Sequence, residues 1–275
     1  MIKVVSWNLA QRADAWRALL QTGADLALVQ EAAAPPPDVA DQMTVDDSPW
    51  LTERASESCK WRTAVVRLNR ELDVTWCTLR PLCSATISDI GVSRPGTLAA
   101  AVVRGAGLAE PITLVSMYGA WEVPLQASKS DWIYADASVH RLISDLSTLI
   151  GHQKGHRVIA AGDLNILHGY GEYGSSYWAA RYKTVFERME ALGLPFVGPQ
   201  HPNGRQAEPW PEELPKGSAN VPTYHTNRQT PATAARQLDF VFASRDLAKQ
   251  TSVRALNEVE TWGPSDHCKI EIELS

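Results

Sequence analysis

The sequence predicts an α/β protein in which a two-layered core of β-strands is flanked by helices. Residues 1–31 indicate a strand, a helix and a second strand, because apolar runs at 2–9 and 24–31 enclose an amphipathic segment at 11–22. Several short apolar or alternating runs follow, at the spacing of antiparallel strands joined by turns. Two longer amphipathic segments later in the chain predict helices that cover this core.

The elements after residue 31 follow from the same patterns. Short strands are predicted at 62–68, 72–79, 85–90, 97–103 and 112–118, with residues 119–131 irregular. The two helices are predicted at 134–151 and 178–192, the second ended by Gly193. Later strands are predicted at 157–161, 238–243, 254–261 and 269–274. The intervening region 195–231 is rich in Pro, Gly and Asn, and a loop of this length is usually functional or mobile.

Composition limits the classes of function. The chain has 275 residues and a net charge of −5, so it carries no global basic field to attract nucleic acid. An enzyme of this charge that acts on nucleic acid would need a local basic cleft or bound cations. The cysteines at 59, 77, 83 and 268 lack the paired spacing of a metal site, and no apolar run or leader indicates a membrane span or export. We therefore expect free thiols and a cytoplasmic location.

The most informative stretch is Gly-Asp-Leu-Asn at 162–165, directly after the apolar run 157–161. Strand alternation predicts that Asp163 and Asn165 share a face. A carboxylate beside a carboxamide suits the binding and orientation of a water molecule. Taken alone, however, a strand that ends in Gly-Asp is usually a plain turn.

Other predicted strands also end or begin with polar side chains. These residues are Asn8, Glu31, Tyr118, Asp239, Asp266 and His267. Each has an ordinary explanation by itself: Asn8 could cap the next helix, Glu31 could be solvated and Tyr118 could belong to the core. Several such residues on one chain, each beside an apolar run, predict one pocket at one rim of the sheets.

The motifs in order resemble the endonuclease/exonuclease/phosphatase superfamily. They are Ser-Trp-Asn-Leu, Val-Gln-Glu, Ser-Met-Tyr-Gly, Gly-Asp-Leu-Asn, Leu-Asp-Phe-Val-Phe and Ser-Asp-His, and they extend from Asn8 to His267. That family includes DNase I-like and exonuclease III-like nucleases, tyrosyl-DNA phosphodiesterases, inositol-polyphosphate phosphatases and neutral sphingomyelinases. The resemblance implies a single domain over residues 1–275, folded as a four-layered α/β sandwich of two packed, mainly antiparallel sheets.

The resemblance also implies Mg²⁺- or Mn²⁺-dependent hydrolysis of a phosphoester. Glu31 would be the principal metal ligand, supported by Asn8 and by a further oxygen from Asp266. Asp163 would orient or deprotonate the attacking water, and Asn165 would position that water or a phosphate oxygen.

The remaining implied roles concern charge on the phosphate. His267 would donate to the phosphoryl oxygens, and Asp239 would hold its ring and favour the imidazolium. Tyr118 would donate to a phosphate oxygen. A serine-hydrolase interpretation of Ser265, Asp266 and His267 fails, because adjacent residues cannot form the relay and no Gly-x-Ser-x-Gly motif is present.

The substrate is the least determined part of this interpretation. Aromatic residues beside arginines suit bases and phosphates, and the candidates for substrate binding are Trp121, Tyr173, Trp178, His225 and Arg236. The same side chains could simply pack the loops. The favoured function is a nuclease or DNA-end phosphodiesterase, with a nucleic-acid partner. The alternatives are a phosphatase or phospholipase-like hydrolase of a small or lipid phosphoester, and a catalytically inactive binding module. No protein partner is indicated.

Overall fold

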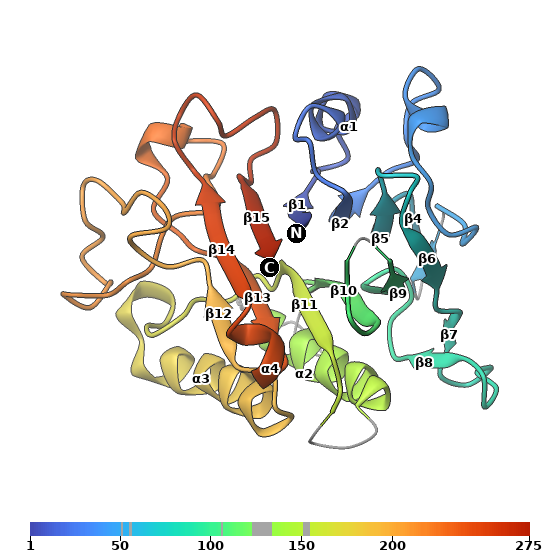
Figure 1. Ribbon diagram of the computed structural model, residues 1–275. Coiled ribbons are helices and arrows are strands. Elements are labelled where there is room, and N and C mark those ends of the chain that lie inside the picture. The colour runs from blue at the N-terminus through green and yellow to red at the C-terminus, as the bar shows by residue number, and fades with distance from the viewer. Residues whose placement is uncertain (51, 55–56, 106, 123–133, 151–154) are drawn as a thin grey trace.

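The structure is a computed structural model that describes residues 1–50, 52–54, 57–105, 107–122, 134–150 and 155–275 (Figure 1). Most of the segment predicted to be irregular, 119–131, therefore lies outside the described residues. No described helix is both long and apolar enough to cross a lipid bilayer. The described cysteines Cys77, Cys83 and Cys268 are free thiols.

The first sheet has five strands in the order β14-β15-β1-β2-β5. Their bounds are β1 (Ile2–Asn8), β2 (Leu26–Ala32), β5 (Arg62–Arg67), β14 (Thr251–Leu256) and β15 (Lys269–Leu274). Helix α1 (Ala13–Leu20) connects β1 to its parallel neighbour β2, which confirms the predicted strand–helix–strand start. The chain ends pair side by side, since β15 runs antiparallel to β1.

The second sheet has six strands in the order β12-β13-β11-β10-β9-β6. Its strands are β6 (Asp73–Trp76), β9 (Leu98–Arg104), β10 (Ile112–Tyr118), β11 (Val158–Asp163), β12 (Phe196–Gly198) and β13 (Asp239–Ala243). Strands β10 and β11 are parallel, and the other neighbours are antiparallel. Two small pairs lie outside these sheets: β3 (Thr52–Arg54) with β4 (Glu57–Cys59), and β7 (Leu79–Pro81) with β8 (Ile90–Val92).

The remaining elements are helical. The longer ones are α2 (Ala135–Leu146) and α3 (Ser176–Ala191), followed by the short α4 (Arg245–Ala248). Single 3₁₀ turns occupy Ala40–Gln42, Ser147–Leu149, Glu172–Gly174 and Pro231–Thr233.

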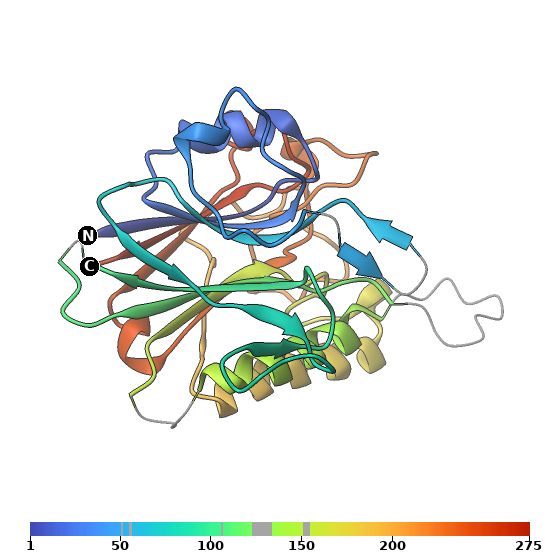
Figure 2. The ribbon, with the colours of Figure 1, turned by 90° about the vertical axis from the view of Figure 1, so that its right-hand side faces the viewer.

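Side-chain alternation produces the layers. On β1, Val4 joins the core between the two sheets, whereas Val5 and Trp7 pack with α1 on the outer face. On β10, Leu114 faces the central core and Val115 faces α2 and α3. Figure 2 shows the result, with α1 on one side of the packed sheets and α2 and α3 on the other. The predicted four-layered sandwich is confirmed.

Three predicted strands differ from the observed ones. The strand predicted at 72–79 is divided, since β6 ends at Trp76 and Leu79 begins β7 in a separate pair. Residues 85–89 form a turn, because the Asp89 carboxylate accepts hydrogen bonds from the backbone and hydroxyl of Thr86, and the strand begins only at Ile90. The predicted strand at 254–261 is β14 and ends at Leu256. There the buried Asn257 side chain donates to backbone oxygens of Arg205 and Pro222 instead of continuing the sheet.

The topology places the predicted site residues at one rim. Parallel strands β1 and β2 end there, as do β10 and β11, while the antiparallel β13 and β15 begin there. Asp163 at the end of β11 is thus in register with Asp239 at the start of β13. A hydrogen bond from the Asn8 side chain to Asp163 joins the rims of the two sheets.

The buried Glu271 on β15 forms ion pairs with Lys3 and Arg254, and these pairs predict how the stability of the protein depends on pH. Burial raises the pKa of Glu271, but hydrogen bonds from Lys3 and Arg254 outweigh burial and lower the pKa below its usual value. A carboxyl whose pKa is lowered by folding stabilises the protein above its unfolded pKa, and loses this contribution as the pH falls through the folded pKa. We expect Glu271→Gln to lower the melting temperature most near neutral pH and progressively less under acid conditions. Thermal melts of both proteins across pH would show a constant difference if the charge of Glu271 were irrelevant.

Candidate active site

A cleft of about 570 Å³ opens at this rim. It is lined by ten of the predicted residues: Glu31, Tyr118, Trp121, Asp163, Asn165, Tyr173, Trp178, Arg236, Asp266 and His267. Asn8 and Asp239 are buried directly behind it, where they contact Asp163 and His267. His225 is the exception, because it does not line the cleft and its ring instead packs against Trp262 at 5.4 Å.

Asn8 connects the acidic side chains of the two sheets. Its Nδ2 atom donates to Glu31 Oε1 at 3.1 Å and to Asp163 Oδ2 at 3.0 Å. The backbone N–H of Ala10 donates to Asn8 Oδ1, which fixes the orientation of the amide. Helix α1 begins at Ala13 with Arg12 as its N-cap, so Asn8 is not a helix cap.

Glu31 owes its direction to an irregularity in β2. The strand continues to Ala32, but its register with β5 shifts between Val29 and Ala32, and Glu31 has a φ of +43°. Such a β-bulge redirects a side chain out of the regular alternation. The Glu31 side chain accordingly lines the cleft instead of continuing the pattern of the sheet.

The Gly-Asp-Leu-Asn segment is a strand end followed by a tight turn. Strand β11 ends at Asp163 and Asn165 has a φ of +52°, so the predicted alternation between these two residues is wrong. The Asn165 backbone donates to Asp163 Oδ1 at 2.9 Å, and its Nδ2 donates to Asp163 Oδ2 at 3.2 Å. Gly162 is required here, because a Cβ atom at this position would lie 1.8 Å from the backbone oxygen of Met117. The turn, rather than strand periodicity, brings the two side chains together.

His267 lies between two carboxylates. Its Nδ1 is 2.8 Å from Asp239 Oδ2, and its Nε2 is 3.6 Å from Asp163 Oδ2. Its backbone oxygen accepts a hydrogen bond from Trp7 Nε1 at 2.9 Å. The Thr223 hydroxyl accepts from the backbone N–H of Asp239, which holds the start of β13 in place. These contacts orient the His267 ring with Nε2 toward Asp163.

Burial and mutual charge shift the pKa values of this group. Burial alone would lower the pKa of His267, but the negative charges of Asp239 and Asp163 raise it to about 10. Burial raises the pKa of Asp163 to about 7, against the opposing effect of His267. The arrangement therefore combines a hydrogen-bond donor of positive charge with a carboxylate poised near neutral pH, which are the properties needed for acid–base chemistry at a phosphate.

Two places could hold a divalent ion. The carboxylates of Glu31 and Asp266 both line the cleft, and such hard oxygen donors suit Mg²⁺ or Mn²⁺. Potential ligand atoms of Asp163, Asp239 and His267 also lie within 4.8 Å of one another. In that second group, the hydrogen bond between Asp239 and His267 already explains why the side chains lie so close together. Asp239 also does not line the cleft. The donor set at Glu31 and Asp266 therefore fits an ion that contacts a substrate better than the buried group does.

The cleft also contains a pair that the sequence interpretation missed. Arg236 donates from both terminal nitrogens to Glu172, at 2.9 Å and 3.3 Å, and both side chains line the cleft. Arg236 was predicted, whereas Glu172 was not. The only signal in the sequence was its place in the polar stretch after Asn165. Tyr224 also lines the cleft, with its ring 4.9 Å from that of His267.

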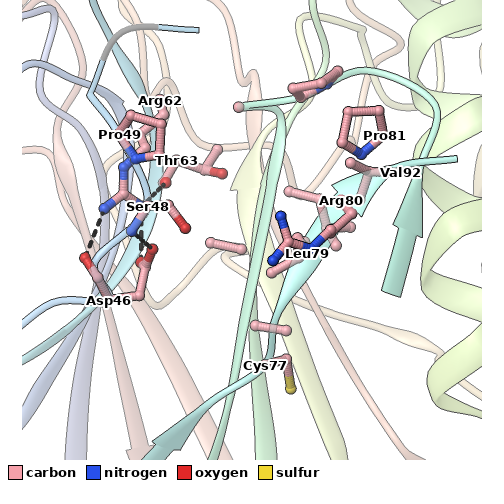
Figure 3. Close-up of a pocket in the computed structure, with 15 residues that line it drawn as sticks. Asp46, Ser48, Pro49, Arg62, Thr63, Cys77, Leu79, Arg80, Pro81 and Val92 are labelled. Atoms are coloured by element: carbon pink, nitrogen blue, oxygen red, sulfur yellow. Dashed lines mark hydrogen bonds and ion pairs between the residues drawn. The ribbon is translucent and has the colours of Figure 1, made fainter. Parts of the chain in front are cut away.

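A second cavity of about 540 Å³ lies beside β5, β7 and β9. Figure 3 shows the ion pair between Asp46 and Arg62 on one wall and the side chains of Leu79 and Pro81 on the other. Apolar residues predominate, and none of the predicted site residues lines this cavity. The site residues whose shifted pKa values are described above thus border the first cleft and not this cavity.

Solved structures with this fold share little sequence with the chain. The AP endonuclease LMAP from Leishmania major matches with a TM-score of 0.66 and 18% identity, over 98% of this chain and 86% of that chain. The endonuclease domain of TRAS1, a telomere-specific non-LTR retrotransposon, matches with a TM-score of 0.61 and 20% identity, over 100% and 98% of the two chains. The 3'-5' exonuclease NExo from Neisseria meningitidis matches with a TM-score of 0.58 and 17% identity, over 100% of both chains.

No curated protein sequence matches the chain. The sequence profile of the Endonuclease/Exonuclease/phosphatase family matches residues 5–267. This range covers nearly the whole chain and includes both Asn8 and His267, the outermost of the predicted site residues. The chain therefore belongs to the Endonuclease/Exonuclease/phosphatase family.

Proposed function

We propose that the protein is a divalent-metal-dependent phosphodiesterase that hydrolyses nucleic-acid phosphodiesters by attack of water on phosphorus. One observation carries this proposal. A continuous chain of contacts links Glu31, Asn8, Asp163, His267 and Asp239 across the two sheets at the wall of a single cleft.

Glu31 and Asp266 are the residues that would hold Mg²⁺ or Mn²⁺, with Asn8 fixing the Glu31 carboxylate. When bound, the ion would neutralise charge on the phosphate. Asp163 accepts a proton from the attacking water as the new P–O bond forms and the ester P–O bond breaks. The departing oxygen is then protonated from solvent. Asn165 is held against Asp163 and positions the water or a phosphate oxygen.

His267 stabilises the negative charge that develops on the phosphoryl oxygens, because its ring carries a proton over the neutral pH range. Asp239 fixes this ring through Nδ1 and balances its charge. Tyr118 lines the same cleft, with its ring packed edge-on against Trp61 at 4.8 Å, and donates to a phosphate oxygen.

Nucleic acid is the substrate best supported by the aromatic side chains and the arginine of the cleft. The fold is shared with proteins described as an AP endonuclease and a 3'-5' exonuclease. The second candidate is a small phosphoester, because four carboxylates and a single arginine line the cleft. The free thiols of the described cysteines support a reducing, cytoplasmic setting.

Metal dependence is the first test. Methyl p-nitrophenyl phosphate, plasmid DNA, short oligonucleotides and phosphomonoesters should be assayed after chelation and after addition of Mg²⁺ or Mn²⁺. We expect chelation to abolish turnover and the ions to restore it. Glu31→Gln should raise the metal concentration for half-maximal activity by at least about 10- to 100-fold, because the loss of a residue that only supports a metal ligand already has an effect of that size. Glu71→Gln, at an exposed position, is the matched control.

Calorimetric titration with Mn²⁺ separates the two possible metal positions without an activity readout. Weaker binding by Glu31→Gln but unchanged binding by Asp239→Asn would support the site in the cleft. The reverse pattern would place the ion at the buried group of Asp163, Asp239 and His267. Full turnover in the presence of chelator would contradict the proposed function.

A further inference from the structure

The charge of the cleft is unsuited to a long duplex. Four carboxylates line it, those of Glu31, Asp163, Glu172 and Asp266, against two cationic side chains, Arg236 and the protonated His267. Arg236 is already engaged by Glu172 through two hydrogen bonds. Specific interfaces with DNA are extended and strongly positive, whereas this chain has a net charge of −5. Affinity for a substrate must therefore come mainly from contacts other than a basic groove.

Exposed aromatic side chains provide such contacts. Trp121 is 58% exposed and Tyr173 is 78% exposed, although both line the cleft. Tyr173 has a φ of +52°, a conformation that costs free energy for a residue other than glycine. In the same cleft, the buried Trp178 packs against Tyr134 at 5.3 Å and Tyr182 at 6.0 Å. The cleft thus contains both packed aromatic rings and two exposed ones.

The Arg236–Glu172 pair adds a donor and an acceptor at one place. A guanidinium offers only N–H donors and a carboxylate offers only acceptors. Phosphate oxygens can accept hydrogen bonds from the Arg236 guanidinium, while sugar hydroxyls or N–H groups of a base can donate to the Glu172 carboxylate. Together with a volume of about 570 Å³, this composition resembles a site for a small molecule more than the surface for a polymer.

We propose that the cleft binds one unpaired nucleotide at a time, with Trp121 and Tyr173 stacking on its base and the Arg236–Glu172 pair contacting its sugar or a neighbouring phosphate. This inference rests on the proposed function, since the scissile phosphate is placed among Glu31, Asp163 and His267. It predicts a preference for mononucleotide esters and single-stranded ends over duplex DNA.

Two chromogenic esters test this selection with the same leaving group. Thymidine 5′-(p-nitrophenyl phosphate) carries a nucleoside, and methyl p-nitrophenyl phosphate carries a methyl group in its place. We expect the wild type, loaded with Mn²⁺, to show a kcat/KM at least about 10-fold higher for the thymidine ester, as stacking of one base permits. Tyr173→Ala and Trp121→Ala should remove most of this preference, because they should raise KM for the thymidine ester far more than KM for the methyl ester.

Matched variants distinguish the loss of stacking from a general disturbance of the cleft structure. Tyr173→Phe retains the ring and should keep the preference. Trp210→Ala removes an exposed aromatic ring that does not line the cleft, and should also keep the preference. Glu172→Gln should raise KM for the thymidine ester more than KM for the methyl ester. Single-stranded oligonucleotides should be degraded at least about 10-fold faster than blunt duplexes of the same sequence.

The possible failures are distinguishable. Three results would overturn the inference and leave the phosphodiesterase proposal intact. They are turnover of the methyl ester without any preference for the thymidine ester, an unaltered preference in both alanine variants, and faster cleavage of the duplex than of the single strand. Absence of metal-dependent turnover on both esters would overturn the proposed function, and the inference with it.

Discussion

Exchange of Asp163 for asparagine is expected to lower kcat about 10²- to 10⁴-fold, the contribution typical of a positioned general base. Asparagine has the same shape but cannot accept the proton of the attacking water. With its side-chain oxygen at the Oδ2 position, asparagine can still accept from Asn8 Nδ2 and Asn165 Nδ2, and only the backbone N–H of Asn165 loses its acceptor. We therefore expect the fold to be retained, and KM to change far less than kcat.

The measurement is steady-state turnover of methyl p-nitrophenyl phosphate at saturating Mn²⁺, beside a thermal melt of each protein. Asp73→Asn is a matched control, because it makes the same chemical change at an exposed position on β6. A kcat within a factor of about 2 of the wild type would remove Asp163 from the reaction.

The second large effect is expected at His267 and Asp239, which should act as a unit. His267→Ala should lower kcat about 10²- to 10³-fold, since a donor to developing oxygen charge is lost. Asp239→Asn should lower kcat by at least about 10-fold, because the ring loses its charged partner at Nδ1. The double variant should match His267→Ala within a factor of about 2, since Asp239 then has no ring to orient.

Stability should respond differently in the same variants. His267→Ala leaves the buried Asp239 without its partner, which is expected to cost about 3–5 kcal/mol of unfolding free energy. The additional change Asp239→Asn removes that buried charge, so the double variant should be more stable than His267→Ala. Chemical denaturation of the four proteins, with activity measured in parallel, tests both claims. Additive losses of kcat would show that the two side chains act independently.

The sequence determined the features that depend on local order. Short apolar runs located β1, β2, β10 and β11, because these strands are buried on both faces. A 3.6-residue apolar period located α1 and both long helices, because each buries one face. The six motifs identified the family and six of the residues that line the cleft, and the aromatic and arginine side chains of the loops identified four more. Where local side-chain contacts competed with periodicity, as at Asp89 and Asn257, the strand boundaries were wrong.

The tertiary structure decided how these residues meet. Asn8 and Asp163 are 155 positions apart, and only the packing of one sheet on the other brings them into hydrogen-bond contact. The bulge that turns Glu31 into the cleft, the pairing of Arg236 with Glu172 and the position of His225 outside the cleft likewise depend on neighbours distant in the chain. A residue's type and spacing reveal what chemistry it can perform, whereas packing between the sheets sets which groups lie within reach of one another.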